Sequence, residues 1–512
     1  MNAQPIMHRT ILICACVMAM IVLFPVFVSA STVRMTTTAV VAYPNYKIAA
    51  LMVTFSDNPA KPIADDRSGP WTKQYLNGVL FANSNSMAAY YAEESEGAVS
   101  VSGDVYDNGA SWYTINRPTA DGDSCNWNTF FSDVLAAADA DVDFRSYNTI
   151  MVFTPQYACD SGGLATTIPN VPDTGGKAYR AAVINGILNT YPHHELGHII
   201  GFGHANSWQC DPPGVLTGTN CRAVEYADRY GIMGSSSRML LLPAPLKERM
   251  GWLRPSEITT AAVDGEYVIN TYELANAGPK VLKIPQERDT AGNITGWYYL
   301  EYRQPVGFDN VPNTPTLQEL GVPNGALVHL GPAGDDLTTT LLDMTPGSRE
   351  SAHDIFEPAL QVGSSCLDPV ADVSFGVVSR TASSMTIRVK FGTTSLCQWK
   401  APAVTVKALK SRAKPGQELQ YKLTVKNGAT LCGKQALELR TTKKPSGWTV
   451  TISKQKKKTF DLLPNESKTY VVRITSPKSA KYQKYSVNIE ARFVERTILK
   501  KTVTLKPSII RR

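Results

Sequence analysis

The chain has 512 residues, of which 43% are hydrophobic and 19% are charged, and its formal net charge is +7. This composition is that of a globular protein and excludes an intrinsically disordered chain, while the length predicts two to four domains. The charge is uneven, because residues 401–512 hold 26 Lys and Arg against 6 Asp and Glu, which leaves 25 basic and 38 acidic residues in 1–400. We therefore expect a domain boundary near residue 400 and different tasks on its two sides.

The N-terminus carries the pattern of a secretory signal. His8 and Arg9 are followed by the apolar run Ile11–Val28 and then by the small residues Ser29 and Ala30. This order predicts a signal peptide over residues 1–30 and a secreted, extracellular protein. An uncleaved N-terminal membrane anchor is the alternative. The sequence holds no other long apolar stretch, so we expect no transmembrane segment after signal cleavage.

Between residues 31 and 255 the chain alternates between buried strands and short helices. Short apolar runs predict strands, and longer stretches in which apolar residues recur every three to four positions predict helices. The predicted strands are Lys47–Ser56, Val99–Gly103, Thr149–Thr154 and Ala178–Ile184, and the predicted helices are Asn83–Glu96 and Phe130–Ala140. Elements mixed in this way predict an α+β domain over residues 31–255.

From residue 256 onward, short alternating runs are separated by Gly, Pro, Asn and Asp. This pattern predicts a β-rich sandwich domain over residues 256–399 and a second, basic domain with an immunoglobulin-like fold over residues 400–512. The basic domain predicts binding to an anionic extracellular polymer or cell surface, and a solvated face that aids solubility is the alternative. It shows no aromatic platforms for bases, so we do not expect sequence-specific nucleic-acid binding.

Four histidines lie close together at His193, His194, His198 and His204. The stretch from His194 to His204 fits the pattern H-E-x-x-H-x-x-G-x-x-H at every fixed position. On a helix, His194 and His198 lie one turn apart on the same face, so both imidazoles can reach one ion. Gly201 can adopt a positive φ, which ends the helix and lets His204 supply a third ligand. We predict one Zn²⁺ ion held by His194, His198 and His204, with His193 as a bystander.

Three imidazoles leave one position of a tetrahedral zinc ion open, as in catalytic rather than structural sites. Glu195 follows the first ligand directly and is predicted to act as general base on a zinc-activated water. The sequence therefore predicts a zinc-dependent endopeptidase acting on a protein or peptide substrate. The alternatives are a surface-binding or adhesive protein with a vestigial or structural zinc site, and a zinc hydrolase acting on a non-peptide amide.

The zinc motif resembles that of the metzincins, and within them the chain is most similar to the gametolysin family. Metzincins carry a methionine-containing turn beneath the zinc, and Glu225–Gly234 resembles that turn with Met233 as its methionine. Further similar stretches are Phe55–Asn58, Ala205, Leu242–Lys247 and Gly251–Leu253. The resemblance covers residues 47–255 and implies a zincin-type catalytic domain and activity on extracellular or cell-wall proteins.

The same resemblance sets expectations for residues near the turn. Ser235 stands where astacin-like enzymes have a tyrosine ligand, so no further protein ligand is expected. Tyr226 and Tyr230 either pack or hydrogen-bond the transition state. The expected fold class is thus α+β, with a zincin-type catalytic domain followed by two β-sandwich domains, the last immunoglobulin-like.

Seven cysteines remain once the signal is removed, and an oxidising compartment favours disulfides. Proximity in sequence suggests the pairs Cys125–Cys159, Cys210–Cys221 and Cys366–Cys397 and leaves Cys432 over, although spacing alone does not fix connectivity. Asp121-Gly122-Asp123 resembles the beginning of a calcium loop, but Cys125 breaks the pattern, so a structural Ca²⁺ ion stays open.

Overall fold

The computed structural model describes residues 45–511 apart from several internal ranges, namely 58–70, 110, 119–125, 156–161, 173, 186–189, 211–214, 217–220, 236–237, 276–277, 311–320, 333–337, 347–356, 393–394, 433 and 454–458. The predicted signal peptide, the Cys125–Cys159 pair and the calcium-like Asp121–Asp123 stretch therefore lie outside the described residues. No helix within the described part of the chain is both long and apolar enough to cross a membrane.

The N-terminal region is built on one sheet with the strand order β2-β1-β4-β6-β5, and β3 also pairs with β1. The strands are β1 (Asn45–Phe55), β2 (Ser100–Tyr106), β3 (Tyr113–Ile115), β4 (Thr149–Thr154), β5 (Gly163–Ile168) and β6 (Tyr179–Asn185). All pairings are parallel except that of β5 with β6. β1 and β4 read as almost continuous apolar runs because both of their faces are covered.

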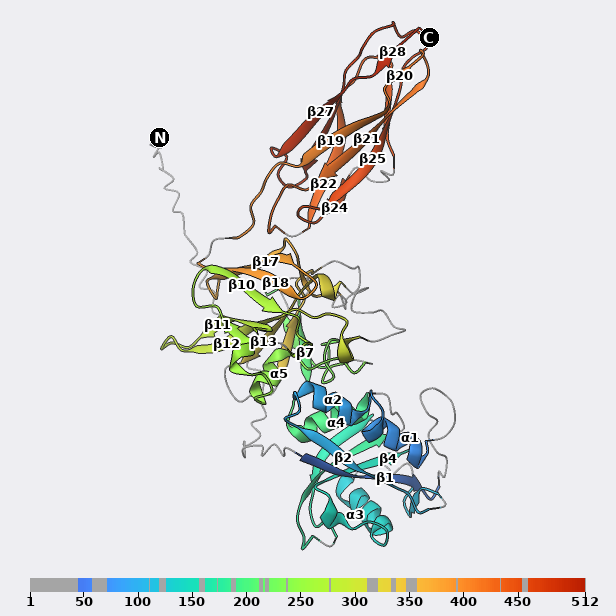
Figure 1. The fold of residues 1–512 in the computed structure, drawn as a ribbon, viewed down its shortest axis with the longest axis vertical. Coiled ribbons are helices and arrows are strands. Elements are labelled where there is room, and N and C mark those ends of the chain that lie inside the picture. The colour runs from blue at the N-terminus through green and yellow to red at the C-terminus, as the bar shows by residue number, and fades with distance from the viewer. Residues whose placement is uncertain are drawn as a thin grey trace, which may run out of the picture. The chain divides into compact units, whose positions relative to one another are not determined.

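Helices cover the two faces of this sheet (Figure 1). One face packs against α1 (Lys73–Asn77), the π-helical turn η1 (Gly78–Ala82), α2 (Met87–Glu94) and α4 (Tyr191–Ile200). The other face packs against α3 (Trp127–Ala138) and the turn η2 (Phe144–Ser146). The sheet thus has a separate apolar core on each side, and α4, which carries the histidine motif, belongs to the first of them.

The middle region contains two further sheets. The larger has the order β8-β7-β14-β13-β12-β11-β9, with β15 paired to β13, and the smaller has the order β10-β18-β17-β16. Their strands are β7 (Ala205–Gln209), β8 (Arg222–Val224), β9 (Ile258–Thr260), β10 (Gly265–Asn270), β11 (Val281–Arg288), β12 (Ile294–Glu301), β13 (Gly325–Pro332), β14 (Thr339–Leu342), β15 (Leu360–Gln361), β16 (Ser365–Asp368), β17 (Val373–Arg380) and β18 (Ser384–Phe391). Residues from both sheets share one apolar core.

Short helices connect these strands. They are α5 (Ala244–Arg249) and the 3-10 turns η3 (Pro255–Glu257), η4 (Gly307–Asp309) and η5 (Val322–Asn324). β7 and β8 precede residue 255, yet β7 pairs in parallel with β14 from Thr339↔Ala205 to Leu342↔Trp208. The larger sheet therefore takes strands from both sides of residue 255, and the chain that leaves α4 enters it directly.

The C-terminal region is a sandwich of two four-stranded sheets, β19-β21-β25-β23 and β24-β22-β26-β27, with a small β20-β28 pair. The strands are β19 (Ala403–Lys410), β20 (Arg412–Ala413), β21 (Glu418–Lys426), β22 (Gln435–Lys443), β23 (Thr449–Ile452), β24 (Thr459–Leu462), β25 (Ser467–Thr475), β26 (Val487–Phe493), β27 (Lys500–Leu505) and β28 (Ser508–Ile509). β21 alternates buried and exposed residues along its length, since one face meets the core and the other meets solvent.

The expected fold class is wrong. Strands make up 44% of the structure and helices 15%, most of the sheets are sandwich-like, and no zincin-like helical catalytic domain is evident in the described residues. The helices are short, since α1, α2 and α5 have only 5, 8 and 6 residues, and strands dominate the regions that follow them. The segments that follow α4 add strands to a large β-sheet. The structure is therefore predominantly β.

The cysteine pairing needs one correction as well. Cys210 and Cys221 form a disulfide, the pair that proximity suggests. Cys397, however, bonds to Cys432, so the expected Cys366–Cys397 pair is wrong. Cys366 is a buried free thiol on β16, where it packs in the core of the middle region. Cys397 lies beyond β18 beside the bridge Gln398↔Thr430, which brings Cys432 to it.

Candidate metal centre

α4 presents the histidine motif as one short helix. It begins at Tyr191 with Pro192 in its first turn, where the missing N–H costs no hydrogen bond. It ends at Gly201, whose φ of 126° is a conformation that favours glycine. The backbone N–H groups of Gly201 and Phe202 both donate to the carbonyl of Gly197, at 3.0 and 2.9 Å. The chain then turns back and enters β7.

This turn brings three imidazoles together. One nitrogen from each of His194, His198 and His204 lies within 4.8 Å of the other two. The Nε2 atoms of His198 and His204 are 3.1 Å apart. For comparison, two nitrogens on one tetrahedral zinc ion are about 3.4 Å apart, given a Zn–N distance of about 2.1 Å. The structure thus places all three predicted ligands around one point.

The other ring nitrogen of each histidine is held by an acceptor. Nδ1 of His194 lies 2.9 Å from the carbonyl oxygen of Ile232, and Nδ1 of His198 lies 2.8 Å from that of Phe202. Nδ1 of His204 lies 2.6 Å from Oε1 of Glu225. With the proton of each neutral ring on Nδ1, where these acceptors lie, each Nε2 keeps a lone pair for a cation. Lone pairs that face one another in this way suit a cation between them.

Electrostatics agree with this assignment of protons. Burial, followed by repulsion from His198, lowers the pKa of His194 to about 4. Burial also lowers the pKa of His198, against the opposing hydrogen bond to Phe202. Both rings are therefore neutral at neutral pH, the form in which imidazole binds a metal. These donors, their tautomers and their convergence fit zinc.

Glu195 follows the first candidate ligand directly and is nearly enclosed, with 4% of its surface exposed. Burial raises its pKa to about 8, and its Oε2 atom has no hydrogen-bond partner among the described residues. A Cβ atom at Gly163 on β5 would lie 2.2 Å from Oε1 of Glu195, so the glycine leaves the room that the carboxylate occupies. A nearby cation would favour the ionised form of Glu195 and lower its pKa again.

The segment 231–234 packs directly against α4. Met233 is fully buried, and a Cβ atom at Gly197 would lie 2.3 Å from its sulfur, so helix and turn are in direct contact. The carbonyl of Met233 accepts from the N–H of Ala205 at 2.9 Å, next to the third histidine. The carbonyl of Ile232 holds His194. Met233 is thus a packing residue, and its neighbour orients a candidate ligand.

Of the other residues that the sequence singled out, Tyr226 contacts the histidine cluster, whereas Tyr230 and His193 are buried in the core. Tyr226 lies on His204 with ring centroids 3.7 Å apart and is 42% exposed. Tyr230 is buried away from solvent. His193 points into the core, where burial lowers its pKa to about 3 and neither ring nitrogen has a described partner. Glu225, which holds His204, was part of the turn motif, but nothing in the sequence assigned it that contact.

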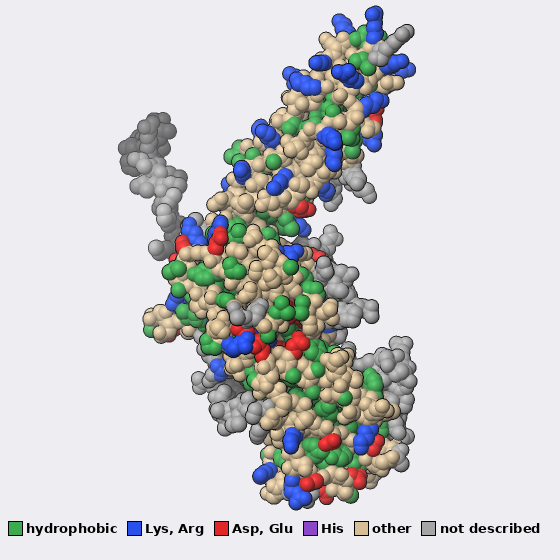
Figure 2. Space-filling view, in the orientation of Figure 1, with side chains coloured by type: hydrophobic (Ala, Val, Ile, Leu, Met, Phe, Trp, Pro, Cys, Tyr) green, Lys and Arg blue, Asp and Glu red, His purple; other side chains and the backbone are tan. Residues whose placement is uncertain are grey.

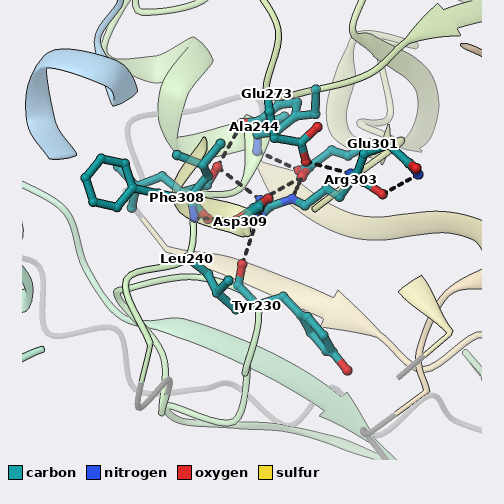
Figure 3. Close-up of polar contacts among 12 residues, drawn as sticks. Tyr230, Leu240, Ala244, Glu273, Glu301, Arg303, Phe308 and Asp309 are labelled. Carbon is teal, nitrogen blue, oxygen red and sulfur yellow. Dashed lines mark hydrogen bonds and ion pairs between the residues drawn. The ribbon is translucent and has the colours of Figure 1, made fainter. Parts of the chain in front are cut away.

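The buried guanidinium of Arg303 binds backbone carbonyls on both sides of the segment that contains Met233 (Figure 3). Arg303, two residues after β12, donates from Nη1 to the carbonyls of Tyr230 and Leu241 at 2.8 and 2.9 Å. Its Nε donates to Oε2 of Glu301 at 2.9 Å, and Oδ2 of Asp309 lies 3.5 Å from Nη1. Arg303 therefore links the middle region to the segment that includes Ile232 and Met233. The sequence offered no signal for this role.

His329 on β13 joins the same polar network, because it lies between Glu301, the partner of Arg303, and Asp228. Its Nε2 lies 3.1 Å from Oδ2 of Asp228, and its Nδ1 lies 3.3 Å from Oε1 of Glu301, an ion pair outside hydrogen-bonding geometry. Asp228 in turn accepts from the N–H of Tyr230 at 2.7 Å. Burial opposes a charge on His329, but Glu301 and then Asp228 outweigh it and raise its pKa to about 9.

We expect the free energy of unfolding to fall as the pH rises from 6.5 to about 9. The folded state raises the pKa of His329 above its ordinary 6.5, so it binds this proton more tightly than the unfolded chain does. The stabilisation is complete below pH 6.5 and is lost as the pH rises through 9. At 1.36 kcal/mol per unit, the loss amounts to about 3 kcal/mol. Urea unfolding on either side of this window measures it.

The matched variant for this measurement is His329→Gln. Other groups also titrate in the window, but they are common to both proteins and cancel in the comparison. We expect the variant to be less stable at low pH and to lose much less stability with rising pH. A variant curve parallel to that of the unchanged protein would refute the role given to His329.

Comparison with known proteins adds information about the C-terminal region. Residues 399–494 match the model of the family described as NPCBM-associated, NEW3 domain of alpha-galactosidase. This match lies within the basic sandwich and spans β19 to β26. No curated protein matches the chain.

Solved structures resemble this chain only distantly. A family 123 glycoside hydrolase from Clostridium perfringens is 10% identical over 22% of this chain and 27% of that one, with a TM-score of 0.19. The Yersinia pseudotuberculosis adhesin InvE is 12% identical over 36% of this chain and 54% of that one, with a TM-score of 0.16. A glycosyl hydrolase family 2 member from Bacteroides cellulosilyticus is 9% identical over 53% and 32%, with a TM-score of 0.14. These scores are too low to carry an argument about function.

Proposed function

We propose that the protein is a secreted zinc-dependent endopeptidase. The observation that carries the proposal is the convergence of one ring nitrogen from each of His194, His198 and His204, in a motif whose Glu195 has an enclosed side chain. The motif of these residues resembles that of gametolysin-like metzincins. Secretion is supported by the signal-like N-terminal sequence and by the Cys210–Cys221 disulfide, since such bonds persist in oxidising compartments.

The residues of the chain divide the work of hydrolysis among them. When bound, zinc supplies Lewis acidity that polarises water and the scissile carbonyl group. Glu195 accepts a proton from the attacking water and delivers it to the leaving amine. Burial that raises its pKa makes this carboxylate a stronger acceptor of the proton from water, while a bound cation would lower the pKa again. Glu225 and Tyr226 hold the ring of His204 in place.

A peptide is the substrate that the neighbouring strand suits. β5 is the last strand in the order of its sheet, and β6 is its neighbour. Its first residue, Gly163, lies against Glu195. An extended peptide can add to a sheet edge through backbone hydrogen bonds, and along β5 this would place a peptide bond next to the carboxyl group. A non-peptide amide would gain nothing from that edge.

Removal of zinc is expected to abolish cleavage of a proteome-derived peptide library, and addition of zinc to restore it. The reason is that the three histidines are the donors described here, and without the ion nothing polarises the carbonyl group. Mass spectrometry of the digested library, before and after treatment with a chelator, measures the effect and gives the cleavage preference.

A control with the chelator already saturated by zinc separates metal removal from inhibition by the chelator itself. Full cleavage by protein shown to hold no metal would contradict the proposal. Cleavage of non-peptide amides without cleavage of any peptide would point instead to a different class of zinc hydrolase.

A second function is favoured by a different observation. The matched family is a domain of alpha-galactosidase, and residues 401–512 carry 26 basic against 6 acidic residues. The charge supports a domain that binds an anionic extracellular polymer or cell surface, and the family match supports an association with carbohydrates. In its strict form this is an adhesive protein whose zinc site is vestigial or structural, and the family match favours this function over peptide hydrolysis.

The two functions separate experimentally. An adhesive protein would bind an anionic polymer in a salt-sensitive manner and would leave the peptide library intact at saturating zinc. An endopeptidase would digest the library whether or not the polymer is present. If both results are positive, the C-terminal domain serves to localise the enzyme.

A further inference from the structure

One end of the C-terminal sandwich gathers basic residues without any acidic ones. It consists of four segments, residues 411–417, 443–448, 477–486 and 506–511, which we call the basic end. None of these segments contains Asp or Glu. Their nine basic residues are all exposed, and they are Arg412, Lys414, Lys443, Lys444, Lys478, Lys481, Lys484, Lys506 and Arg511. Figure 2 shows Lys and Arg side chains gathered at the end of this domain where Figure 1 labels β20 and β28.

Backbone contacts hold the four segments together. The N–H of Ile510 donates to the carbonyl of Ala413, and that of Ile509 donates to the carbonyl of Gln483, both at 3.0 Å. The N–H of Gly416 donates to Oγ of Ser476 at 3.0 Å, beside the third segment. The fourth segment joins through Trp448, whose ring centroid lies 4.6 Å from that of Tyr485. The nine cations therefore lie at one end of the domain.

Other basic residues of this domain form ion pairs with carboxylates, and the nine cations of the basic end do not do so within the described residues. Arg440, Arg473, Arg492 and Lys500 on the strands form ion pairs with Glu490, Glu418 and Glu438. None of the nine cations forms an ion pair with a carboxylate that the structure describes. Glu418, which begins β21 next to the first segment, forms an ion pair with Arg473 at 2.8 Å. Like charges gathered without counter-charges repel one another and attract a polyanion.

We infer that the basic end binds an anionic polysaccharide. The inference rests on the proposed binding function of the C-terminal domain and names the surface and the partner. Seven of the nine cations are lysines, which act as point charges toward repeated anionic groups rather than as bidentate readers of bases. Within the four segments, the exposed large hydrophobic residue is Tyr482, at 57%. The guanidinium of Arg511 lies 5.7 Å from the centre of its ring.

This composition favours a polysaccharide over two other polyanions. A single-stranded nucleic acid is held by several aromatic side chains on which successive bases stack, and the basic end offers one exposed ring. A bilayer is held by apolar side chains that insert beside the basic ones, and Tyr482 alone does not form such a set. One aromatic face can accommodate one sugar ring, while the lysines around it contact the anionic groups of the neighbouring sugars.

The test uses the full chain and dextran sulfate, with uncharged dextran as the control polymer. The variant Lys414→Gln, Lys481→Gln, Lys484→Gln removes three charges from the basic end. The matched variant Lys407→Gln, Lys422→Gln, Lys426→Gln removes three exposed charges from β19 and β21. We expect affinity for dextran sulfate to fall by about tenfold or more in the first variant and by less than about twofold in the second. The salt dependence of binding should become shallower in the first variant alone.

Each other outcome is informative. If the unchanged protein binds dextran but not dextran sulfate, or binds neither, the proposed polyanion-binding function fails as a whole. If both variants weaken binding to dextran sulfate alike, that function stands and its assignment to the basic end is overturned. Tighter binding to single-stranded DNA or to phosphatidylglycerol vesicles than to dextran sulfate would contradict the inference that the partner is a polysaccharide. Circular dichroism checks that both variants are folded.

Discussion

Replacing Glu195 with glutamine is expected to lower the rate of peptide hydrolysis by roughly a thousandfold while the protein still holds zinc. Glutamine has nearly the same shape as glutamate, so it fits the space that Gly163 leaves. It cannot accept the proton of the attacking water. None of the three converging nitrogens belongs to Glu195, so metal binding should survive. Turnover of a fluorogenic peptide and zinc content per chain are the two measurements.

Glu225→Gln is the control for this result. It weakens the contact to Nδ1 of His204 and should lower zinc affinity by about tenfold to a hundredfold, as loss of an outer partner of a ligand typically does. At saturating zinc it should retain most of its activity, which Glu195→Gln should not. A Glu195→Gln variant that cleaves peptides at the full rate would remove the general base from the proposal.

Replacing Arg303 with methionine is expected to cost about 3–5 kcal/mol of unfolding free energy. The change leaves Glu301 and Asp309 buried without this cation and removes the donor of the Tyr230 and Leu241 carbonyls. Burial of such groups without partners is far more costly than loss of an exposed pair. We also expect weaker zinc binding, because the segment that Arg303 holds includes the carbonyl of Ile232 that orients His194.

Arg388→Met is the matched control, since Arg388 forms an ion pair with Glu266 in which both side chains are well exposed. It should change the unfolding free energy by no more than about 1 kcal/mol in the same urea titration. Arg303→Lys keeps the charge but not the fork of donors, so it should fall between Arg303→Met and the unchanged protein. Equal stability of the Arg303→Met and Arg388→Met variants would show that the buried network contributes little.

Local features were the ones that the sequence predicted well. β4 begins and ends at Thr149 and Thr154 as predicted, and α2 and α3 lie within a few residues of the expected helices. These elements follow from hydrophobic periodicity, which acts between near neighbours in the chain. The fold class, in contrast, could not be predicted from hydrophobic periodicity. The sequence shows which segments are strands, but not that β7 would leave α4 to pair with β14, more than a hundred residues away.

The candidate site divides in the same way. The sequence by itself placed His194 and His198 on one helical face with Glu195 directly after the first of them, because a helix repeats every 3.6 residues whatever surrounds it. Only the tertiary structure decided which acceptor holds each Nδ1 atom, how Asp228 meets His329 and why Cys397 bonds to Cys432. Asp228 and His329 are 101 residues apart. Contacts over such separations depend on the way whole sheets pack, and no local pattern encodes them.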